Sequence, residues 1–401
     1  MNATNYDNGQ QYFPTGIHWQ VAQATSLQNI GINMPTSTDT QPATAVGIFM
    51  ENGSGGMISD IVFYGGNIGF VAGSQQFTAR GLTFTNCLTA VNMLWNWGFT
   101  WSQIAITNVY VGFNVSSNGG STGQGTGSIA IIDSDFNHAE WGITTHTGGD
   151  PPAIILANVY CENSPLMVQV SGGATTLTVG DTDTIDFWAS GYRYIAANGT
   201  GSDVTGYLDT APVRPPSLLD PAGEYFWQDP PLYSSLTASS FVVATESGVS
   251  NDGTGDQTAA INTLLDNNVG TPIFFPAGIY QVQGTVQIPV GSIIVGSAWS
   301  QIMGTGSYFQ DVNNPQVMVR VGNQGESGTI QISDMLFTVK GPTAGAILME
   351  WNVHELGQGS GMSSLSHLSI ISQLLDAKSL TPAFSYYSGH GKSGYQHAGR
   401  I

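Results

Sequence analysis

Leu-Thr-Phe-Thr-Asn at residues 82–86 returns as Ile-Ala-Ile-Thr-Asn at 104–108 and, shortened, as Ile-Leu-Ala-Asn at 155–158. Looser copies are Ile-Val-Phe at 61–63 and Ile-Ile-Asp-Ser at 131–134. Aligned on one apolar position of each copy, the repeats stand 21, 22, 26 and 24 residues apart, at Phe63, Phe84, Ile106, Ile132 and Leu156. Short strands with apolar alternation and a drifting period in the twenties predict an all-β solenoid whose turns differ in length.

A small or polar residue follows each aligned position by two places, at Gly65, Asn86, Asn108, Ser134 and Asn158. Stacked one turn above the next, such side chains predict an internal amide ladder at a bend. The alternative is an ordinary β-sandwich with Asn-rich turns. Sandwich strands recur at about 8 to 12 residues, and the longer interval therefore favours the solenoid.

The charge balance narrows the choice of ligand. The chain of 401 residues carries 27 acidic and 8 basic residues, a formal net charge of −19. A nucleic-acid partner needs a basic stripe, which the chain lacks, and a polyanion such as pectate would be repelled over most of the surface. Nine Trp and fifteen Tyr favour a neutral carbohydrate instead, and no apolar run is long enough to predict a membrane partner.

Cysteine and histidine usage predicts neither a disulfide nor a metal. If Cys87 and Cys161 occupy equivalent bends three turns apart, three inter-strand steps of ~4.8 Å separate them. That separation exceeds the ~7 Å limit for a bridge, so we expect two buried thiols. His18 and His146 are isolated, and no cluster has metal-ligand spacing. We therefore expect no metal and no cofactor.

Two solenoid domains are predicted, at residues 1–210 and 236–362, joined by a Pro-rich linker at 211–235. The phrase Ile-Ser-Asp-Ile-Val-Phe at 58–63 returns in the second domain as Ile-Ser-Asp-Met-Leu-Phe at 332–337. Ahead of the second domain, Asp256 can cap a helix whose apolar face consists of Ala260, Ile261, Leu264 and Leu265. Such a helix would cover an open solenoid end, as repeat folds require.

The two ends of the chain depart from this scheme. The first domain shows no capping helix before its first repeat, and we expect it to begin partway through. The second domain is expected to be incomplete at its C-terminus, because the strand phrase disappears after Ser363. Residues 363–401 form an atypical tail, which is either disordered or the product of a misjoined gene end.

Several phrases resemble a known family. Asp252–Ile261 with Phe275–Tyr280 resembles the start of the pectate-lyase-like, right-handed parallel β-helix superfamily. Four further phrases, in order, resemble glycoside hydrolase family 55, the exo-β-1,3-glucanases: Glu51–Gly56 with Ile58–Asp60, Gly73–Thr78, Trp95–Gly98 and Glu350–Asn352. The resemblance covers roughly residues 12–361.

The resemblance implies two tandem right-handed β-helices with the substrate cleft between them. It also implies removal of glucose from the end of β-1,3-glucan with inversion, by a secreted enzyme that we expect to be a monomer. The N-terminus shows no signal peptide. Inversion needs a carboxylic acid and a water on the opposite face of the sugar, with the two carboxyl groups about 6.5 to 9.5 Å apart.

The same resemblance suggests catalytic and substrate-binding residues. A Gln in the pair Gln75 and Gln76 would position the attacking water, with a hydroxyl one turn later. Gln76 and Thr100 are 24 residues apart, and we expect them to be vertical neighbours; alternatively, Gln76 belongs to a bend ladder. Glu350 precedes Trp351, and apolar surroundings raise the pKa of a carboxyl group. The family's general acid is nevertheless expected beyond this phrase, which leaves Glu350 as a cleft residue or a catalytic one.

Trp95, Trp97, Phe99 and Trp101 alternate along one predicted strand, which places them on one face. We expect an outward platform for glucose rings, because four large aromatic side chains would crowd a solenoid interior. Packing beneath a loop is the alternative. Asp133 and Asp135 flank a strand position and are expected to be solvated bend acids.

Three functions compete. The first is an exo-β-1,3-glucanase. The second is a polysaccharide lyase, which needs a basic residue to take a proton, whereas Arg80 and Arg193 are the only basic residues of the first predicted domain. The third is a non-catalytic β-glucan-binding remnant of the same family, which holds the polysaccharide without the general acid.

Overall fold

The computed structural model describes residues 13–20, 25–38, 42–118, 124–148, 150–208, 211–227, 231–354, 364–366 and 369–371. Over these residues the chain consists mainly of β-strands, with a single α-helix, α1 (Thr258–Asn267). No helix of this part is long and apolar enough to cross a membrane. The chain divides into two compact units, with the boundary after Tyr225. The all-β prediction is confirmed.

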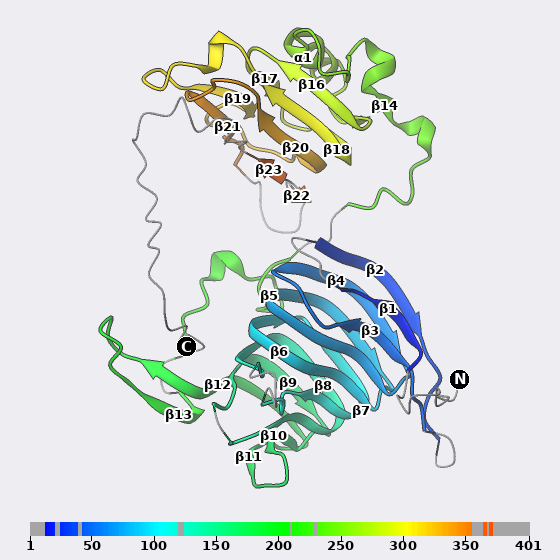
Figure 1. Cartoon of the computed structure of the whole chain (residues 1–401), viewed down its shortest axis with the longest axis vertical. Helices are drawn as coiled ribbons and strands as arrows, with labels where there is room; N and C mark the ends of the chain where they lie inside the picture. Colours follow the sequence, from blue (N-terminus) through cyan, green and yellow to red (C-terminus); the bar gives the residue numbers. More distant parts are fainter. Residues whose placement is uncertain are drawn as a thin grey trace. The chain divides into compact units, whose positions relative to one another are not determined.

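Unit 1 is one large, mostly parallel sheet, drawn from blue to green in Figure 1. Its main path runs β1-β3-β5-β6-β7-β8-β9-β12-β13. The strands are β1 (Thr15–His18), β2 (Thr25–Asn33), β3 (Val46–Met50), β4 (Gly56–Tyr64), β5 (Ile68–Thr85), β6 (Thr89–Ser102), β7 (Ala105–Asn114), β8 (Ser128–Thr145), β9 (Ala153–Glu162), β10 (Leu166–Val170), β11 (Thr175–Thr178), β12 (Thr182–Tyr194) and β13 (Gly201–Tyr207).

Successive strands of unit 1 stack in parallel, and the register shows which residues are equivalent. We call the stretch from one residue to its partner on the next strand a rung. One line of equivalent residues consists of Phe63, Phe84, Ile106, Phe136 and Cys161. The first three of these were aligned correctly from the sequence, and the parallel stacking of the repeated phrase is confirmed.

The last two aligned positions were wrong. Ile132 and Leu156 lie on the strand segment that precedes the bend, where Ile132 pairs with Ala157. The error arose because the connection between β7 and β8 lengthens the rung that follows Ile106. The amide ladder is correspondingly confirmed only in its middle, where Asn108 Nδ2 donates to Asn86 Oδ1 at 2.6 Å. This bond is exposed, so the expectation that the ladder is internal was wrong.

A second line of equivalent residues turns each rung by adopting a left-handed backbone. This corner line consists of Asp60, Gly81, Gln103, Asp133 and Asn158, with φ between 49° and 61°. Asp and Asn enter this region more readily than other non-glycine residues because their side chains form local hydrogen bonds. In unit 2 the matching phrase places Asp334 at φ 56°. The repeated Ile-Ser-Asp phrase therefore encodes a corner between two strand segments.

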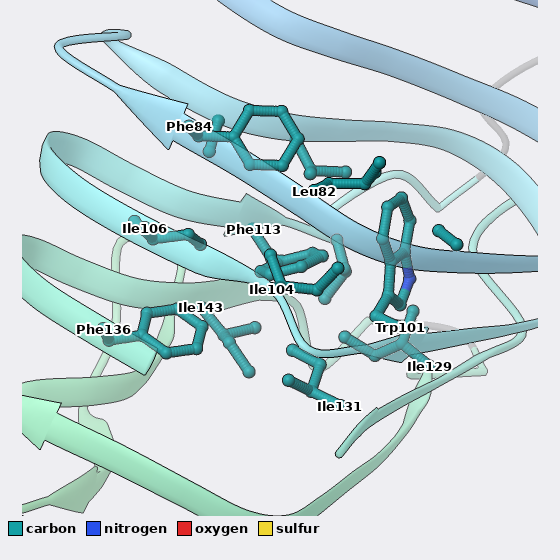
Figure 2. Packing of buried hydrophobic residues seen from close by; sticks show 14 of the residues in the cluster. Leu82, Phe84, Trp101, Ile104, Ile106, Phe113, Ile129, Ile131, Phe136 and Ile143 are labelled. Atoms are coloured by element: carbon teal, nitrogen blue, oxygen red, sulfur yellow. The ribbon is translucent and has the colours of Figure 1, made fainter. Parts of the chain in front are cut away.

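The interior of unit 1 is filled by aromatic and branched side chains. Phe63 stacks on Phe84 with ring centroids 4.6 Å apart. Trp101 packs between Phe70 and Phe113, at centroid distances of 5.9 and 5.1 Å, and is fully buried. Figure 2 shows Trp101 pointing into this core beside Ile129 and Ile131.

Cys87 and Cys161 are buried free thiols, as expected. Burial raises the pKa of each thiol to about 12. Their positions are not equivalent, however. Cys161 pairs with Phe136 inside a strand, whereas Cys87 directly follows the bend at Asn86.

The last strands of unit 1, from β9 to β13, include antiparallel pairs. β12 pairs antiparallel with β9, and β13 pairs antiparallel with β12. β10 and β11 form a further antiparallel pair, and β10 also continues the parallel stack on β8. A hairpin thus occupies the edge of β9 that a further rung would otherwise use.

The Pro-rich segment is bound to unit 1 as far as Tyr225. Arg214 forms an ion pair with Asp133, whose side chain is fully buried, and the guanidinium lies 4.5 Å from the ring centroid of Tyr225. Asp133 also accepts hydrogen bonds from the Tyr225 backbone N–H at 2.8 Å and from Asn158 Nδ2 at 2.6 Å. The expectation that Asp133 is a solvated bend acid was wrong, because this segment covers it.

Unit 2 contains two parallel sheets, ordered β14-β15-β18-β20-β22 and β17-β19-β21, with β16 and β23 pairing at the side of the first. The strands are β14 (Val242–Val243), β15 (Pro272–Phe274), β16 (Gly278–Val282), β17 (Val286–Ile288), β18 (Ile293–Gly304), β19 (Gln316–Val321), β20 (Gln331–Val339), β21 (Ala346–Trp351), β22 (Ser364–Ser366) and β23 (Ser369–Ile371).

Helix α1 packs its apolar face on the core of unit 2 through Ile261, Leu264 and Leu265. Asn262 Nδ2 donates to the Thr285 carbonyl at 3.1 Å, and Asn262 Oδ1 accepts from the Gln287 N–H at 2.8 Å. These bonds satisfy backbone groups of edge strand β17 that would otherwise be free to pair with another chain.

The contrast between two tryptophans of β6 tests this core. Trp101→Ala is expected to lower the free energy of unfolding by about 3–5 kcal/mol, because it removes a fully buried indole and leaves a cavity. Trp97→Ala changes an exposed position and is expected to alter stability by no more than about 0.5 kcal/mol. Urea denaturation of both variants measures the difference, and equal effects would contradict the assigned burial.

Removal of Arg214 tests the attachment of the Pro-rich segment. Arg214→Ala leaves the Asp133 carboxylate buried without its cation and is expected to cost about 3 kcal/mol. Hydrogen exchange of the Tyr225 amide, which donates to Asp133, should accelerate. Arg193→Ala removes an exposed arginine of the same unit and serves as the control; identical exchange in both variants would refute the attachment.

Candidate functional site

The two glutamines singled out in the sequence lie where β5 turns a corner. Ser74 is fully buried, Gln75 is half-buried, Gln76 is exposed and Phe77 is buried again. The inward residues Ser74 and Phe77 are three positions apart, whereas inward residues of a straight strand are two positions apart. The backbone therefore bends between them. The bend presents both glutamine side chains toward the outside of unit 1.

The rungs next to Gln76 carry glycine at the matching positions. Gln76 pairs with Gly98 on β6, and a Cβ built on Gly98 would approach only Ser128 Oγ, at 3.0 Å. On the other side, a Cβ built on Gly55 would stand 3.9 Å from Gln76 Nε2. The positions next to Gln76 on the two neighbouring rungs therefore carry no side chains.

Trp97 is the most exposed aromatic residue of this corner, with 56% of its surface exposed. Trp95 is half-buried and donates from Nε1 to the Glu51 carbonyl at 2.7 Å. We call the surface formed by Gln75, Gln76, Trp97 and Gly98 the corner surface.

The predicted four-residue aromatic platform was wrong for its second half. Phe99 and Trp101 are 2% and 0% exposed and belong to the core, so Trp101 cannot stack on a sugar. The corner between Trp97 and Phe99 breaks the alternation, because Trp97 is exposed while Phe99, two residues later, is buried. The extra residue of β6 relative to β5, Leu94, lies before all four aromatic residues.

Thr100 lies near Gln76 but is not its direct neighbour. In the parallel register Thr100 pairs with Thr78, and Gln76 pairs with Gly98. The expectation of vertical neighbours was wrong because the rung here is two residues shorter than the separation of Gln76 and Thr100. The two residues are diagonal neighbours on one outward face, and Thr100 is half-buried.

Glu350 lies in unit 2, near the end of β21. Its Oε1 accepts from Arg320 Nε at 2.9 Å and from Asn352 Nδ2 at 2.8 Å. These two hydrogen bonds lower the pKa of the Glu350 carboxyl, and the positive charge of Arg320 adds to the effect. The neighbouring Trp351 does not reverse it. Glu350 therefore has the electrostatics of an ionised carboxylate, opposite to those of a general acid.

Raised carboxyl pKa values occur instead where the Pro-rich segment meets unit 1. Desolvation raises the pKa of Asp135, although the residue is exposed as expected, and burial together with Asp133 raises the pKa of Glu224. Glu224 lies in the Pro-rich segment that covers Asp133, and its raised pKa therefore belongs to the attachment of that segment.

The ion-binding potential of the described residues is low. Among them, no group of three or more His, Cys, Asp and Glu side chains could hold a metal ion. The two histidines considered from the sequence have ordinary partners: His18 Nε2 lies 3.2 Å from Glu51 Oε1, and His146 Nδ1 lies 2.8 Å from the Gly148 carbonyl.

Two residues of the corner escaped the sequence analysis. Asn96 is 3% exposed and its side chain binds the backbone of the next rung, and Ser128 Oγ donates to the Trp97 carbonyl at 3.1 Å. In the sequence, nothing about an Asn between Trp95 and Trp97 indicates that its side chain is buried. Ser128 gives no sign of its position either, since its approach to Gly98 depends on a rung of irregular length.

The chain matches the family model described as rhamnogalacturonase A/epimerase, pectate lyase-like, over residues 1–114 and 241–355. It is 37% identical over 366 residues to the non-secreted LysM effector LysM19 of Penicillium expansum, which covers 88% of this chain and 29% of that protein. It is also 37% identical over 354 residues to the glucan 1,3-beta-glucosidase of Cochliobolus carbonum, with coverage of 86% and 44%.

A third relative is the probable glucan endo-1,3-beta-glucosidase of Arthroderma benhamiae, 31% identical over 446 residues, with 86% of this chain and 50% of that protein covered. The chain thus spans at most half the length of these relatives. Names of this kind support the resemblance to glycoside hydrolase family 55. With more than half of its residues matched by the family model, the chain belongs to the pectate lyase-like family of rhamnogalacturonase A and epimerase.

Proposed function

We propose that the corner surface of unit 1 binds β-1,3-glucan and that the chain is an exo-β-1,3-glucanase that releases glucose with inversion. The observation that carries the proposal is the exposed indole of Trp97 beside Gln75 and Gln76. An indole face stacks on the apolar face of a glucose ring, and amide side chains bind sugar hydroxyls. The relatives named for glucan 1,3-beta-glucosidase activity support the same polysaccharide.

The proposal includes the finer architecture. We propose two tandem right-handed β-helices, at residues 1–210 and 236–362, connected through the Pro-rich segment at 211–235. The parallel register within each unit supports it, as does the left-handed corner that Asp60 and Asp334 share.

In the proposed reaction Gln76 holds the attacking water, and the Thr100 hydroxyl assists from its diagonal position. An inverting enzyme also needs a carboxylic acid that is protonated at the working pH. Glu350, whose pKa is lowered, is poorly suited to that role. We therefore propose that Glu350 contacts the substrate and does not act as the general acid.

The lowered pKa of Glu350 is also the observation that favours the second candidate, a module that binds β-glucan without cleaving it. A polysaccharide lyase is less favoured. With a net charge of −19, the chain would repel the anionic substrate that such chemistry requires.

The proposed site of action is outside the cell, where β-glucan is accessible, and the glucanase relatives support this. The relative LysM19 carries the opposite description, non-secreted, in its name. Detection of the native protein in the culture medium, and not only in cell extracts, is the expected result.

Glucose release from laminarin by the purified chain tests the activity directly. The enzyme proposal predicts release of glucose with the α-configuration, because inversion converts a β-linkage into an α-product. Binding of laminarin without release of glucose would support the second candidate. If the chain neither binds laminarin nor releases glucose from it, both candidates are refuted.

Trp97→Ala tests the corner surface. Loss of one stacked indole is expected to raise the Kd for laminarin on the order of tenfold, because a well-placed aromatic contact contributes about 1.4 kcal/mol. Tyr207→Ala removes an equally exposed aromatic residue of the same unit, also 56% exposed, and is the matched control. Equal affinities of the two variants would exclude Trp97 from the binding site.

A further inference from the structure

Asn96 connects two rungs through its side chain at the point where their backbones do not form a regular ladder. Asn96 Oδ1 accepts from the Gly127 N–H at 2.8 Å and from the Ser128 N–H at 3.0 Å, and Asn96 Nδ2 donates to the Ser128 carbonyl at 3.0 Å. The backbones of these two rungs form one isolated parallel bridge here, with Asn96 N–H donating to the Gly125 carbonyl at 3.1 Å and Gly127 N–H to the Asn96 carbonyl at 3.0 Å. Continuous pairing of β6 with β8 begins at Phe99. The Asn96 amide thus adds side-chain bonds to an isolated bridge, between it and the start of the regular ladder.

The neighbouring rung carries a glycine, Gly127, where its backbone approaches Asn96 and Trp97. A Cβ built on Gly127 would stand 2.8 Å from the Asn96 carbonyl oxygen and 3.0 Å from the Trp97 carbonyl oxygen. Only glycine therefore allows the two backbones to approach this closely. Ser128 adds a bond in the reverse direction, from its Oγ to the Trp97 carbonyl at 3.1 Å.

Behind the corner surface lies a line of three buried polar side chains, and Asn96 is the middle one. Ser74, Asn96 and Thr126 are equivalent inward residues of three successive rungs, 0%, 3% and 3% exposed. The hydroxyls of Ser74 and Thr126 have no hydrogen-bond partner among the described residues. Of these three side chains, Asn96 is the one that forms hydrogen bonds, through both its oxygen and its nitrogen.

We propose that Asn96 is a positioning residue for the glucan-binding surface. The inference rests on the function proposed above and concerns a residue that touches no sugar. Asn96 acts through the backbone of Trp97 and Ser128: it sets the direction of the Trp97 indole relative to Gln76, which pairs with the residue after Trp97. Affinity for β-1,3-glucan therefore depends on a side chain that is almost completely buried.

Asn96→Ala tests the proposal with two measurements on the purified full chain. Hydrogen exchange of the Ser128 amide should accelerate, because this N–H donates to Asn96 Oδ1. The Gly127 amide should respond less, since it also donates to the Asn96 backbone carbonyl, which the variant keeps. The Kd for laminarin should rise on the order of tenfold, since small displacements of a binding group reduce productive contact strongly. If the chain hydrolyses laminarin, KM should rise by a similar factor while kcat changes by less than about twofold.

Asn108→Ala is the matched control, because it removes another side-chain amide bond between rungs, to Asn86, at a different corner. It should leave the Gly127 and Ser128 exchange rates and the laminarin affinity unchanged. Gly127→Ala disturbs the same contact from the opposite strand and should reproduce the loss of affinity. It keeps the proposal testable if Asn96→Ala fails to fold.

The outcomes separate this inference from the proposed function. If the wild-type chain binds laminarin and Asn96→Ala binds it equally well, the positioning role is refuted and the proposed function stands. If the wild-type chain binds no laminarin, the proposed function fails and the positioning role fails with it. The exchange rates then still report whether Asn96 holds the two rungs together.

Discussion

Parallel pairing between rungs, with a left-handed residue at each position of the corner line, is the constraint on which the rest of the structure depends. In a parallel stack each strand takes its place from the strand beneath it, and a slip of one residue would reverse every side chain. The corner line from Asp60 to Asn158 prevents such slips, because each rung must bend at the matching position. The interior aromatic residues, from Phe63 to Trp101, can stack only while this register is kept.

The corner surface follows from the same constraint. Gln76 and Gly98 are neighbours because β5 and β6 keep a regular register after the extra residue at Leu94. Past that point, the bend of the chain directs Trp97 outward and Phe99 inward. Asn96 then binds the next rung through its side chain, next to an isolated backbone bridge. An exposed surface of this kind is therefore determined mainly by residues that lie behind it.

The corner line also has a second use. Asp133 and Asn158 are equivalent residues, and Asn158 Nδ2 donates to the same carboxylate that binds Arg214 and the Tyr225 backbone. A position that bends the chain thus also attaches the segment leading out of unit 1. The buried charge is compensated by one cation and two hydrogen bonds, which is the arrangement that a buried carboxylate requires.

Much of the fold could be predicted from the sequence, because the repeated phrase carries the period, the apolar alternation and the polar corner. The predicted alignment failed after Ile106, since a single long connection changes the rung length and the phrase itself does not reveal it. The aromatic platform failed because alternation assumes a straight strand, whereas the corner between Trp97 and Phe99 reverses the faces. The burial of Asp133 was beyond sequence analysis, because its partners lie 81 and 92 residues away.

The central claim is that the corner surface holds β-1,3-glucan, and a structure of the chain in complex with laminaritriose tests it most directly. The account predicts one glucosyl ring stacked on the indole of Trp97, with a hydroxyl within hydrogen-bond distance of the Gln75 or Gln76 amide. A trisaccharide bound at another surface, with Trp97 left in contact with solvent, would contradict it.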